Sequence, residues 1–343
     1  MSTAISVLIV EDSAFARKVL RDVLSAAEGI RVVGVAHDGL DALEKISELQ
    51  PDVVTLDLLM PGLDGVGVLL ALAERNDAPR VVVVTTLDEH SELGVAALQA
   101  GAVDVVQKPT AIATNRLYGL ADELVEKVRV AAAAKGTRCP VATSPLDAAP
   151  AITAAATDVL VIGASTGGPR AVGLLLSALP KRFPVPIAIA LHMPQGYTEA
   201  MAARFDADSA IEVREAHNGV EVRPGQAVIA PGGIHLRLRR VGQSCVTELS
   251  PEPVVSLHHP SVDVLFESAS AGWGARALGV VLTGMGDDGL AGSRAIHGAG
   301  GRILTEAESS CVVYGMPRAV FEANLALVSA PIERMVSTIL ARL

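Results

Sequence analysis

The chain has 343 residues, more than the roughly 250–300 over which one hydrophobic core usually stays undivided, so its length predicts two domains. Half of its residues are hydrophobic, only 3% are aromatic and the formal net charge is −10; the few aromatics and the acidity argue against a nucleic-acid partner. No apolar stretch reaches the ~20 residues that span a membrane, so we expect no membrane insertion and a cytoplasmic location.

Residues 1–130 alternate between strand and helix patterns. Strands are expected at Ser6–Val10, Arg31–Ala36, Val53–Asp57, Arg80–Thr85 and Val103–Gln107, and helices at Ala14–Ala26, Leu40–Leu49, from about Gly65, at Glu92–Gly101 and at Ile112–Val130. Five such βα units predict a doubly wound parallel sheet, in which function gathers at the carboxyl ends of the strands. This segment also holds most of the acidity, with 11 basic and 20 acidic residues against 17 and 18 in residues 131–343.

Polar side chains stand at four of these strand ends. Glu11 and Asp12 follow the first strand, Asp57 the third, Thr85 the fourth and Lys108 the fifth. Three close carboxylates need a cation to stay ionised together, and Mg²⁺ suits them because it is a hard ion that prefers oxygen ligands. A bound phosphoryl group would be stabilised by the same metal, a hydroxyl donor and a lysine charge. Asp57 is therefore the candidate nucleophile that accepts a phosphoryl group.

The same segment resembles the response-regulator receiver family over roughly residues 5–128. The matching motifs are VED (10–12), DLLMPGLDG (57–65), VTT (84–86) and QKP (107–109). The resemblance implies a flavodoxin-like fold, phosphorylation of Asp57 by a histidine kinase, and Mg²⁺ bound by Glu11, Asp12, Asp57 and the backbone carbonyl of Leu59. Many receivers carry a mobile aromatic ring three residues before the lysine, but Val105 stands there in this chain.

Residues 131–157 contain 11 alanines and 3 prolines and predict a linker to a second domain at 158–343. That domain begins with a strand, Asp158–Ile162, which runs into GASTGG (163–168) and a helix from about Pro169. The motif fits G-x-S-x-G, which can place Ser165 on a sharp strand-to-helix turn beside backbone N–H groups that stabilise an oxyanion. A glycine-rich phosphate-binding loop is the alternative, although the spacing suits neither a dinucleotide loop nor a P-loop.

A nucleophilic serine needs a base and an acid that orients the base. The histidines of the domain are His192, His217, His235, His258, His259 and His297. His192 is favoured because it directly follows the apolar run Val185–Leu191 at a strand end. The strand Ala277–Leu282 precedes TGMGDDG (283–289), so Asp287 or Asp288 fits the acid and spacing does not choose between them, while Asp263 is a weaker competitor.

With those residues assembled, the domain resembles the catalytic domain of the chemotaxis protein-glutamate methylesterase (CheB) family. The matching segments are IGASTGGP (162–169), LHMPQGYT (191–198), APGGIHL (230–236), HHPSVDVLF (258–266), LTGMGDDG (282–289) and VYGMPRA (313–319). The resemblance implies a Rossmann-like fold, a triad of Ser165, His192 and Asp288, and oxyanion donors at the backbone N–H groups of Thr166 and Met285.

The resemblance also implies the reaction and its partners. Ser165 would remove methyl groups from glutamate γ-methyl esters on methyl-accepting chemotaxis receptors, and would deamidate receptor glutamines through the same acyl-enzyme. No cofactor is expected in this domain, and phosphorylation of the receiver would relieve its inhibition. Two other hypotheses are a response regulator with a non-catalytic protein-binding output domain and a nucleotide-binding second domain.

Overall fold

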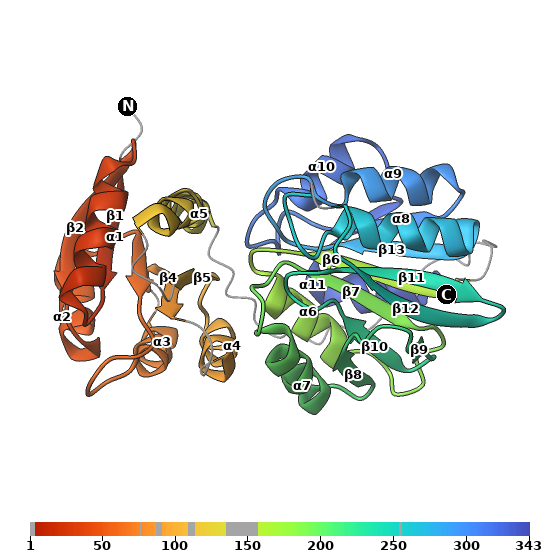
Figure 1. The fold of residues 1–343 in the computed structure, drawn as a ribbon, viewed down its shortest axis with the longest axis horizontal. Coiled ribbons are helices and arrows are strands. Elements are labelled where there is room, and N and C mark those ends of the chain that lie inside the picture. The colour runs from red at the N-terminus through yellow and green to blue at the C-terminus, as the bar shows by residue number, and fades with distance from the viewer. Residues whose placement is uncertain (1–3, 76, 87–90, 109–113, 135–156, 254–255) are drawn as a thin grey trace. The chain divides into compact units, whose positions relative to one another are not determined.

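The chain forms two compact units, Met1–Ala134 and Lys135–Leu343 (Figure 1). The computed structural model describes residues 4–75, 77–86, 91–108, 114–134, 157–253 and 256–343. Among the helices of these ranges, none is both long enough and apolar enough to cross a bilayer.

The first unit is a five-stranded parallel sheet in the order β2-β1-β3-β4-β5. Its elements are β1 (Ile5–Val10), α1 (Ala14–Ala26), β2 (Ile30–Ala36), α2 (Gly39–Leu49), β3 (Val53–Leu56), α3 (Gly65–Ala73), β4 (Arg80–Thr86), α4 (Ser91–Gln99), β5 (Asp104–Lys108) and α5 (Thr114–Ala133). The doubly wound sheet predicted from the sequence is therefore confirmed.

Local chemistry explains where these helices start and stop. Asp38 accepts from the N–H groups of Leu40 and Asp41 at the start of α2, and Asp64 accepts from that of Gly67 in α3. Helix α5 continues to Ala133, three residues into the segment expected as a linker, because alanine is the strongest helix former. Residues 135–156 of the expected linker lie outside the described residues, as do 112 and 113 of the expected helix.

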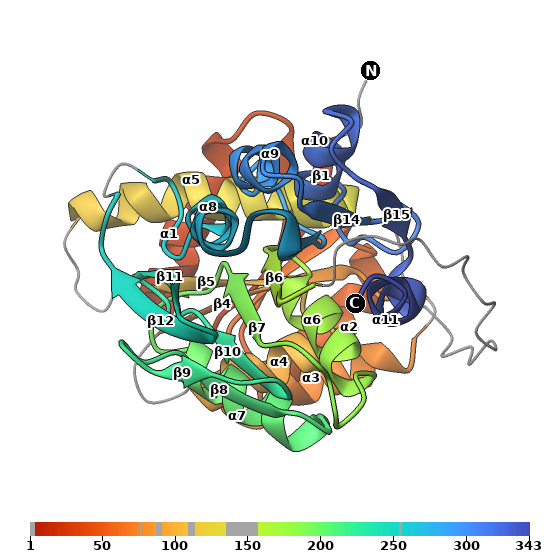
Figure 2. The same ribbon diagram turned by 90° about the vertical axis from the view of Figure 1, so that its right-hand side faces the viewer.

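The second unit is built on a seven-stranded parallel sheet in the order β15-β14-β13-β6-β7-β10-β8. Helices α8, α9 and α10 cover one face of this sheet, and α6, α7 and α11 cover the other (Figure 2). The elements are β6 (Val159–Ala164), α6 (Gly168–Ser177), β7 (Ile187–Leu191), α7 (Thr198–Asp208), β8 (Glu212–Glu215), β9 (Glu221–Val222), β10 (Gln226–Ile229), β11 (His235–Val241), β12 (Ser244–Ser250), α8 (Val262–Trp273), a 3₁₀ turn (Gly274–Arg276), β13 (Ala277–Val281), α9 (Leu290–Gly298), β14 (Arg302–Glu306), α10 (Met316–Glu322), β15 (Val328–Ala330) and α11 (Ile332–Leu340).

The chain order of this sheet creates one switch point. From β6 the chain adds β7, β8 and β10 on one side, with β10 between β7 and β8, and then returns to the other side of β6 for β13, β14 and β15. In open α/β sheets a binding crevice lies where the strand order reverses, at the carboxyl ends, here between β6 and β13. The antiparallel sheet β11-β12-β9 was not predicted, although His235 had been placed on an alternating strand.

Helix α8 lies close to β6 because Gly163 has no side chain. A Cβ atom at Gly163 would stand 2.2 Å from Cγ1 of Val262, the first residue of α8. Any side chain at this position would push the N-terminus of α8 away from the end of β6. The first glycine of GASTGG therefore permits a helix approach next to the switch point.

Candidate active site and acidic pocket

Three loops at the carboxyl edge of the second sheet are tied together by backbone hydrogen bonds. The N–H of His192, just after β7, donates to the carbonyl of Ala164 at the end of β6 (3.1 Å). The N–H of Ser165 donates to the carbonyl of Thr283, just after β13 (3.0 Å). His192 is thus fixed to the end of β6, and Ser165 is fixed to the loop after β13, which brings Ser165, His192 and the 283–289 loop to one place.

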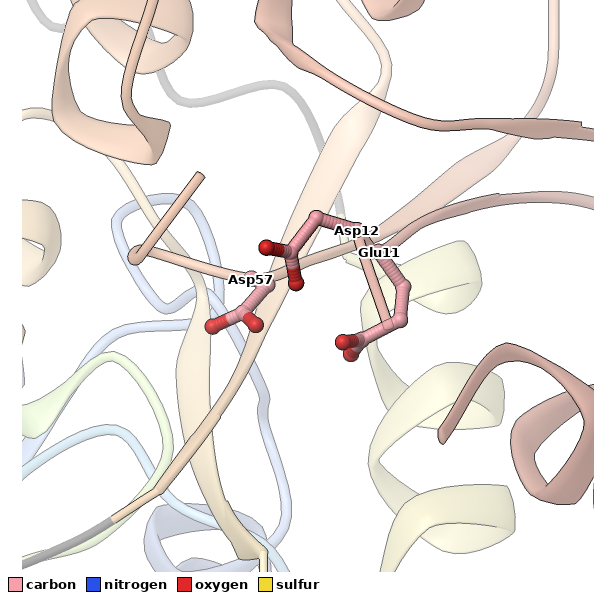
Figure 3. A group of neighbouring side chains, drawn as sticks. All are labelled: Glu11, Asp12 and Asp57. Carbon is pink, nitrogen blue, oxygen red and sulfur yellow. The ribbon is translucent and has the colours of Figure 1, made fainter. Parts of the chain in front are cut away.

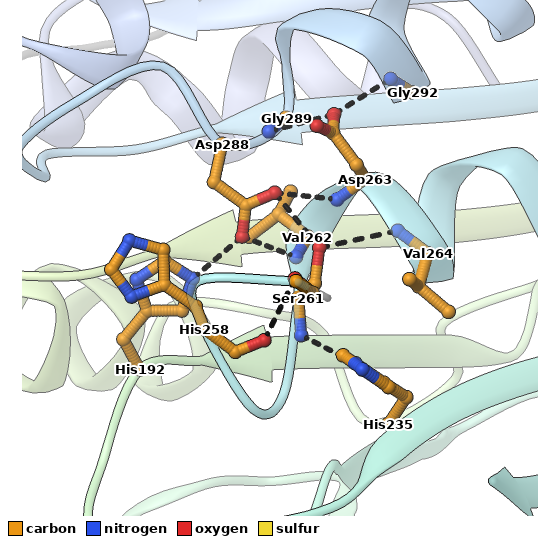
Figure 4. A network of polar contacts seen from close by, with 11 residues as sticks. His192, His235, His258, Ser261, Val262, Asp263, Val264, Asp288, Gly289 and Gly292 are labelled. Atoms are coloured by element: carbon orange, nitrogen blue, oxygen red, sulfur yellow. Dashed lines mark hydrogen bonds and ion pairs between the residues drawn. The ribbon is translucent and has the colours of Figure 1, made fainter. Parts of the chain in front are cut away.

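His192 and Asp288 form a direct pair in this crevice. Nε2 of His192 lies 2.8 Å from Oδ2 of Asp288, and the two side chains are only 10% and 9% exposed (Figure 4). Asp287, the alternative that spacing had left open, is exposed and is not in contact with His192.

The N-terminus of α8 surrounds the Asp288 carboxylate with donors. The N–H groups of Val262 (2.8 Å) and Asp263 (2.9 Å) and the hydroxyl of Ser261 (3.0 Å) all donate to it. Burial alone would raise the pKa of Asp288, but its hydrogen bond and charge interaction with His192, and then the two N–H groups, hold that pKa well below its usual value. Asp288 is therefore an anion at any physiological pH.

An ionised Asp288 decides which nitrogen of His192 can act as a base. An anionic carboxylate accepts, so Nε2 carries the proton of the neutral ring and Nδ1 keeps its lone pair. Nδ1 is buried and has no hydrogen-bond partner among the described residues. Ser165 is half-buried, and it follows the end of β6 just as His192 follows the end of the adjacent strand β7. Ser165 makes no hydrogen bond to Nδ1 of His192, and such catalytic hydrogen bonds commonly form only when substrate is bound.

The loop after β13 also approaches Ser165 closely. A Cβ atom at Gly284 would lie 2.8 Å from the Cβ atom of Ser165, so only glycine fits there. The Gly284 carbonyl accepts from the N–H groups of Gly315 and Met316, which fixes the peptide that leads to Met285. On the other side of Ser165, the Thr166 carbonyl accepts from the hydroxyl of Thr283 (3.0 Å).

The other candidate side chains lie elsewhere. His217 and His297 are exposed, and His235 is fully buried, where its Nδ1 accepts from the N–H of Ser261 (3.1 Å). Asp263 does not contact His192: its carboxylate accepts from the N–H groups of Gly289 and Gly292 at the start of α9. Burial, followed by the neighbouring charge of Asp288, raises the pKa of Asp263 to about 6.

Ser261 and Thr283 were not singled out in the sequence analysis, and His258 was considered there only as a candidate base. Ser261 is the N-cap of α8, and a serine before an apolar helical run is a readable N-cap signal, but that signal does not reveal the carboxylate it will meet. The ring of His258 stacks on that of His192 with centroids 4.1 Å apart, a contact that no local pattern indicates.

In the first unit, Glu11, Asp12 and Asp57 come together as the strand ends predicted. Each offers a carboxylate oxygen within 4.8 Å of the others (Figure 3). Nζ of Lys108 lies 2.5 Å from Oε2 of Glu11 and 2.6 Å from Oδ2 of Asp57. Glu11 and Asp57 are buried, whereas Asp12 is exposed, so the cluster opens toward solvent at Asp12.

The charges of this pocket suit a hard divalent cation. Three carboxylates face one ammonium group, which leaves negative charge for an ion with oxygen ligands to neutralise. Burial raises the pKa of Glu11, and the adjacent charge of Asp57 adds to that rise, against the lowering effect of Lys108. Thr85 places a buried hydroxyl at the same edge, and that oxygen has no hydrogen-bond partner among the described residues. Val105 is 2% exposed and is part of the core.

These features define a protein class: a response regulator whose second unit has the layout of a serine hydrolase. A family model described as response regulator receiver domain matches residues 7–118, and one described as CheB methylesterase matches residues 160–339. The catalytic domain of CheB methylesterase from Thermotoga maritima is 36% identical, with a TM-score of 0.52 over 54% of this chain and 98% of that one.

Full-length relatives agree with both units. The chain is 62% identical to protein-glutamate methylesterase/protein-glutamine glutaminase 5 of Myxococcus xanthus over 97% of this chain and 96% of that protein. It is 41% identical to protein-glutamate methylesterase/protein-glutamine glutaminase 2 of Methanosarcina acetivorans over 98% of both. The chain belongs to the CheB methylesterase family and carries a receiver domain. A non-catalytic output domain finds no support in these relatives.

The contact between His192 and Asp288 generates a prediction that separates the two adjacent aspartates. Asp288→Asn should slow labelling of Ser165 by a fluorophosphonate about 10³–10⁴-fold, because an amide at this position favours the wrong imidazole tautomer. Labelling is followed by intact-protein mass spectrometry. The matched variant Asp287→Asn should label at the wild-type rate, and a larger loss in Asp287→Asn than in Asp288→Asn would contradict the assignment.

Glu306, at the end of β14, is a buried acid beneath the Ser165 turn. Its carboxylate accepts from the N–H of Thr283 (2.8 Å) and the hydroxyl of Ser310 (2.8 Å). Burial raises its pKa from the ordinary 4.5 to about 6 despite these two donors. Between these two values the unfolded chain loses its proton first, so ionisation of Glu306 weakens the folded state as the pH rises.

The free energy of unfolding of Glu306→Gln, taken relative to that of wild type, should therefore rise by about 2 kcal/mol from pH 4.5 to pH 7. The amide oxygen still accepts from Thr283, so the fold is kept. Urea unfolding can be followed by the fluorescence of Trp273, the only tryptophan of the chain, which lies in the second unit. Glu308→Gln, an exposed neighbour, should show no such pH trend, and an equal trend in both variants would refute the prediction.

Proposed function

We propose that this chain hydrolyses glutamate γ-methyl esters, and deamidates glutamines, on methyl-accepting chemotaxis receptors, and that phosphorylation of its receiver activates it. The observation that carries the proposal is the buried His192–Asp288 pair at the switch point beside Ser165. The names of the two full-length relatives support the substrate. The enzyme would work in the cytoplasm, on receptor segments exposed there.

In the first half of the reaction, Oγ of Ser165 attacks the γ-carbonyl carbon of the ester. The hydroxyl proton passes to Nδ1 of His192, and the carbonyl oxygen becomes an oxyanion held by the N–H groups of Thr166 and Met285. When the C–O bond to the methoxy group breaks, His192 returns that proton to the leaving methoxide, and methanol departs. A glutamyl ester of Ser165 remains.

In the second half, a water molecule attacks the glutamyl ester and gives its proton to Nδ1 of His192. The bond to Ser165 then breaks, the serine recovers the proton, and a glutamate side chain is released. A glutamine substrate follows the same route with ammonia as the leaving group. Throughout both halves, ionised Asp288 stabilises the imidazolium form of His192 and keeps the ring in the productive tautomer.

The receiver would accept its phosphoryl group on Asp57 from a histidine kinase of the chemotaxis system. Glu11, Asp12, Asp57 and the carbonyl of Leu59 would hold Mg²⁺, which when bound neutralises the charge of the incoming phosphoryl oxygens. Lys108 and the hydroxyl of Thr85 would hold the phosphoryl oxygens afterwards. The added charge shifts a two-state equilibrium of the receiver toward a form that no longer inhibits the esterase.

The esterase proposal is tested by methanol release from a methylated chemoreceptor. The wild-type chain should release methanol, whereas Ser165→Ala should lose about 10⁶ in turnover and look blank. Ser177→Ala, which removes an exposed hydroxyl on α6, is the matched control and should keep the wild-type rate. Equal methanol release by wild type and Ser165→Ala would contradict the proposed mechanism.

The switch is tested with the full chain, Mg²⁺ and acetyl phosphate. Methanol release should rise about 5- to 150-fold, the usual span of an allosteric coupling, and chelation of the metal should prevent the rise. Asp57→Asn should keep the basal rate without the rise, whereas Asp22→Asn, an exposed aspartate of α1, should respond like wild type. A full response in Asp57→Asn would show that Asp57 is not the phosphorylated residue.

A further inference from the structure

His258 is in contact with the ring of His192, and the mechanism above does not use it. Its ring lies over the ring of His192, with centroids 4.1 Å apart and planes inclined by 20° (Figure 4). Both histidines are mostly shielded from solvent. Such a geometry is close to parallel stacking, in which one ring covers the face of the other.

The segment that carries His258 is itself firmly held. The His258 carbonyl accepts from the hydroxyl of Ser256 (3.1 Å), and the next carbonyl, that of His259, accepts from the N–H of Gly233 (2.9 Å). The segment then enters α8 through Ser261, whose hydroxyl donates to Asp288. One short stretch of chain thus contacts both the base and the acid that orients it.

We propose that His258 is a positioning residue for the base: its ring fixes the plane of His192 and, when unprotonated, stabilises the imidazolium that forms during catalysis. This inference rests on the proposed function of His192. The single hydrogen bond from Nε2 to Asp288 fixes one atom of the ring but allows the ring to tilt about it, and a flat partner on its face prevents that tilt.

The charge of His258 matters as much as its shape. A neutral aromatic face attracts a cation, whereas a protonated imidazole at this distance repels one. Because the two rings are in contact, a proton on either ring disfavours a proton on the other.

The titratable groups around the pair are Asp288 after β13, Asp263 at the start of α8, His235 on β11 and His259 beside His258. Burial, first of all, lowers the pKa of His235, which favours the neutral form of that ring. All four groups remain in a variant of His258, so a comparison of variants isolates the effect of His258.

The test compares His258→Phe, which keeps a stacked ring without its charge, with His258→Ala, which removes both. On methylated receptor at pH 8, His258→Ala should lose about 10- to 100-fold in kcat with little change in KM, because the base is no longer held in place. His258→Phe should recover most of that loss. His297→Ala, which removes an exposed histidine of α9, is the matched control and should behave as wild type.

A ring titration of His192 by NMR gives a readout that is independent of any substrate. In His258→Phe the midpoint for His192 should move to higher pH by about one unit, because the competing positive charge is gone. Either a wild-type kcat in His258→Ala or an unchanged His192 midpoint in His258→Phe would overturn the proposal. If wild type released no methanol, the substrate would be wrong, and the ring titration would still decide whether the stacked pair is coupled.

Discussion

The second unit depends on one interaction: the Asp288 carboxylate at the N-terminus of α8. Isolated, a carboxylate this deeply placed would be costly to ionise, because burial disfavours charge. Two N–H groups of the first turn of α8, one hydroxyl and the ring of His192 all donate to it. Hydrogen bonds to a charged group contribute about 1.5–3 kcal/mol each, so four of them outweigh the burial penalty. The dipole of the helix end acts in the same direction.

That interaction places a constraint on the packing beneath it. Helix α8 must approach the end of β6 closely enough for its N–H groups to reach a residue that follows β13, and β6 lies directly beside β13. The missing side chain of Gly163 makes the approach possible, because Val262 occupies the space that a Cβ atom would need. The same motif therefore carries the candidate nucleophile and admits the helix that orients the candidate base.

The closeness of residues at different strand ends could be predicted from the sequence, because the carboxyl ends of parallel strands share one edge of a sheet. That reasoning placed Asp57 near Lys108, and Ser165 near His192, before any coordinates. It could not choose between Asp287 and Asp288, since adjacent side chains differ only in direction, and the choice depends on α8, a helix some 25 residues earlier in the chain. The stacking of His258 on His192 was missed because it joins residues far apart in the chain. The β11-β12 hairpin is local, with Val241 paired to Ser244, and of this sheet only the strand around His235 had been anticipated.

The three buried acids around the switch point differ in how readily their carboxyl groups ionise. Asp263 and Asp288 both accept from backbone N–H groups, and Glu306 accepts from one as well. Yet burial raises the pKa of Asp263 and of Glu306 to about 6, while that of Asp288 stays low. The difference is the partner: only Asp288 faces a ring that can become a cation, and its own charge pushes Asp263 toward neutrality. Of these three acids, Asp288 is the one that ionises most readily, and it is the one that contacts the candidate base, so an imidazolium formed on His192 has a counterion already in place.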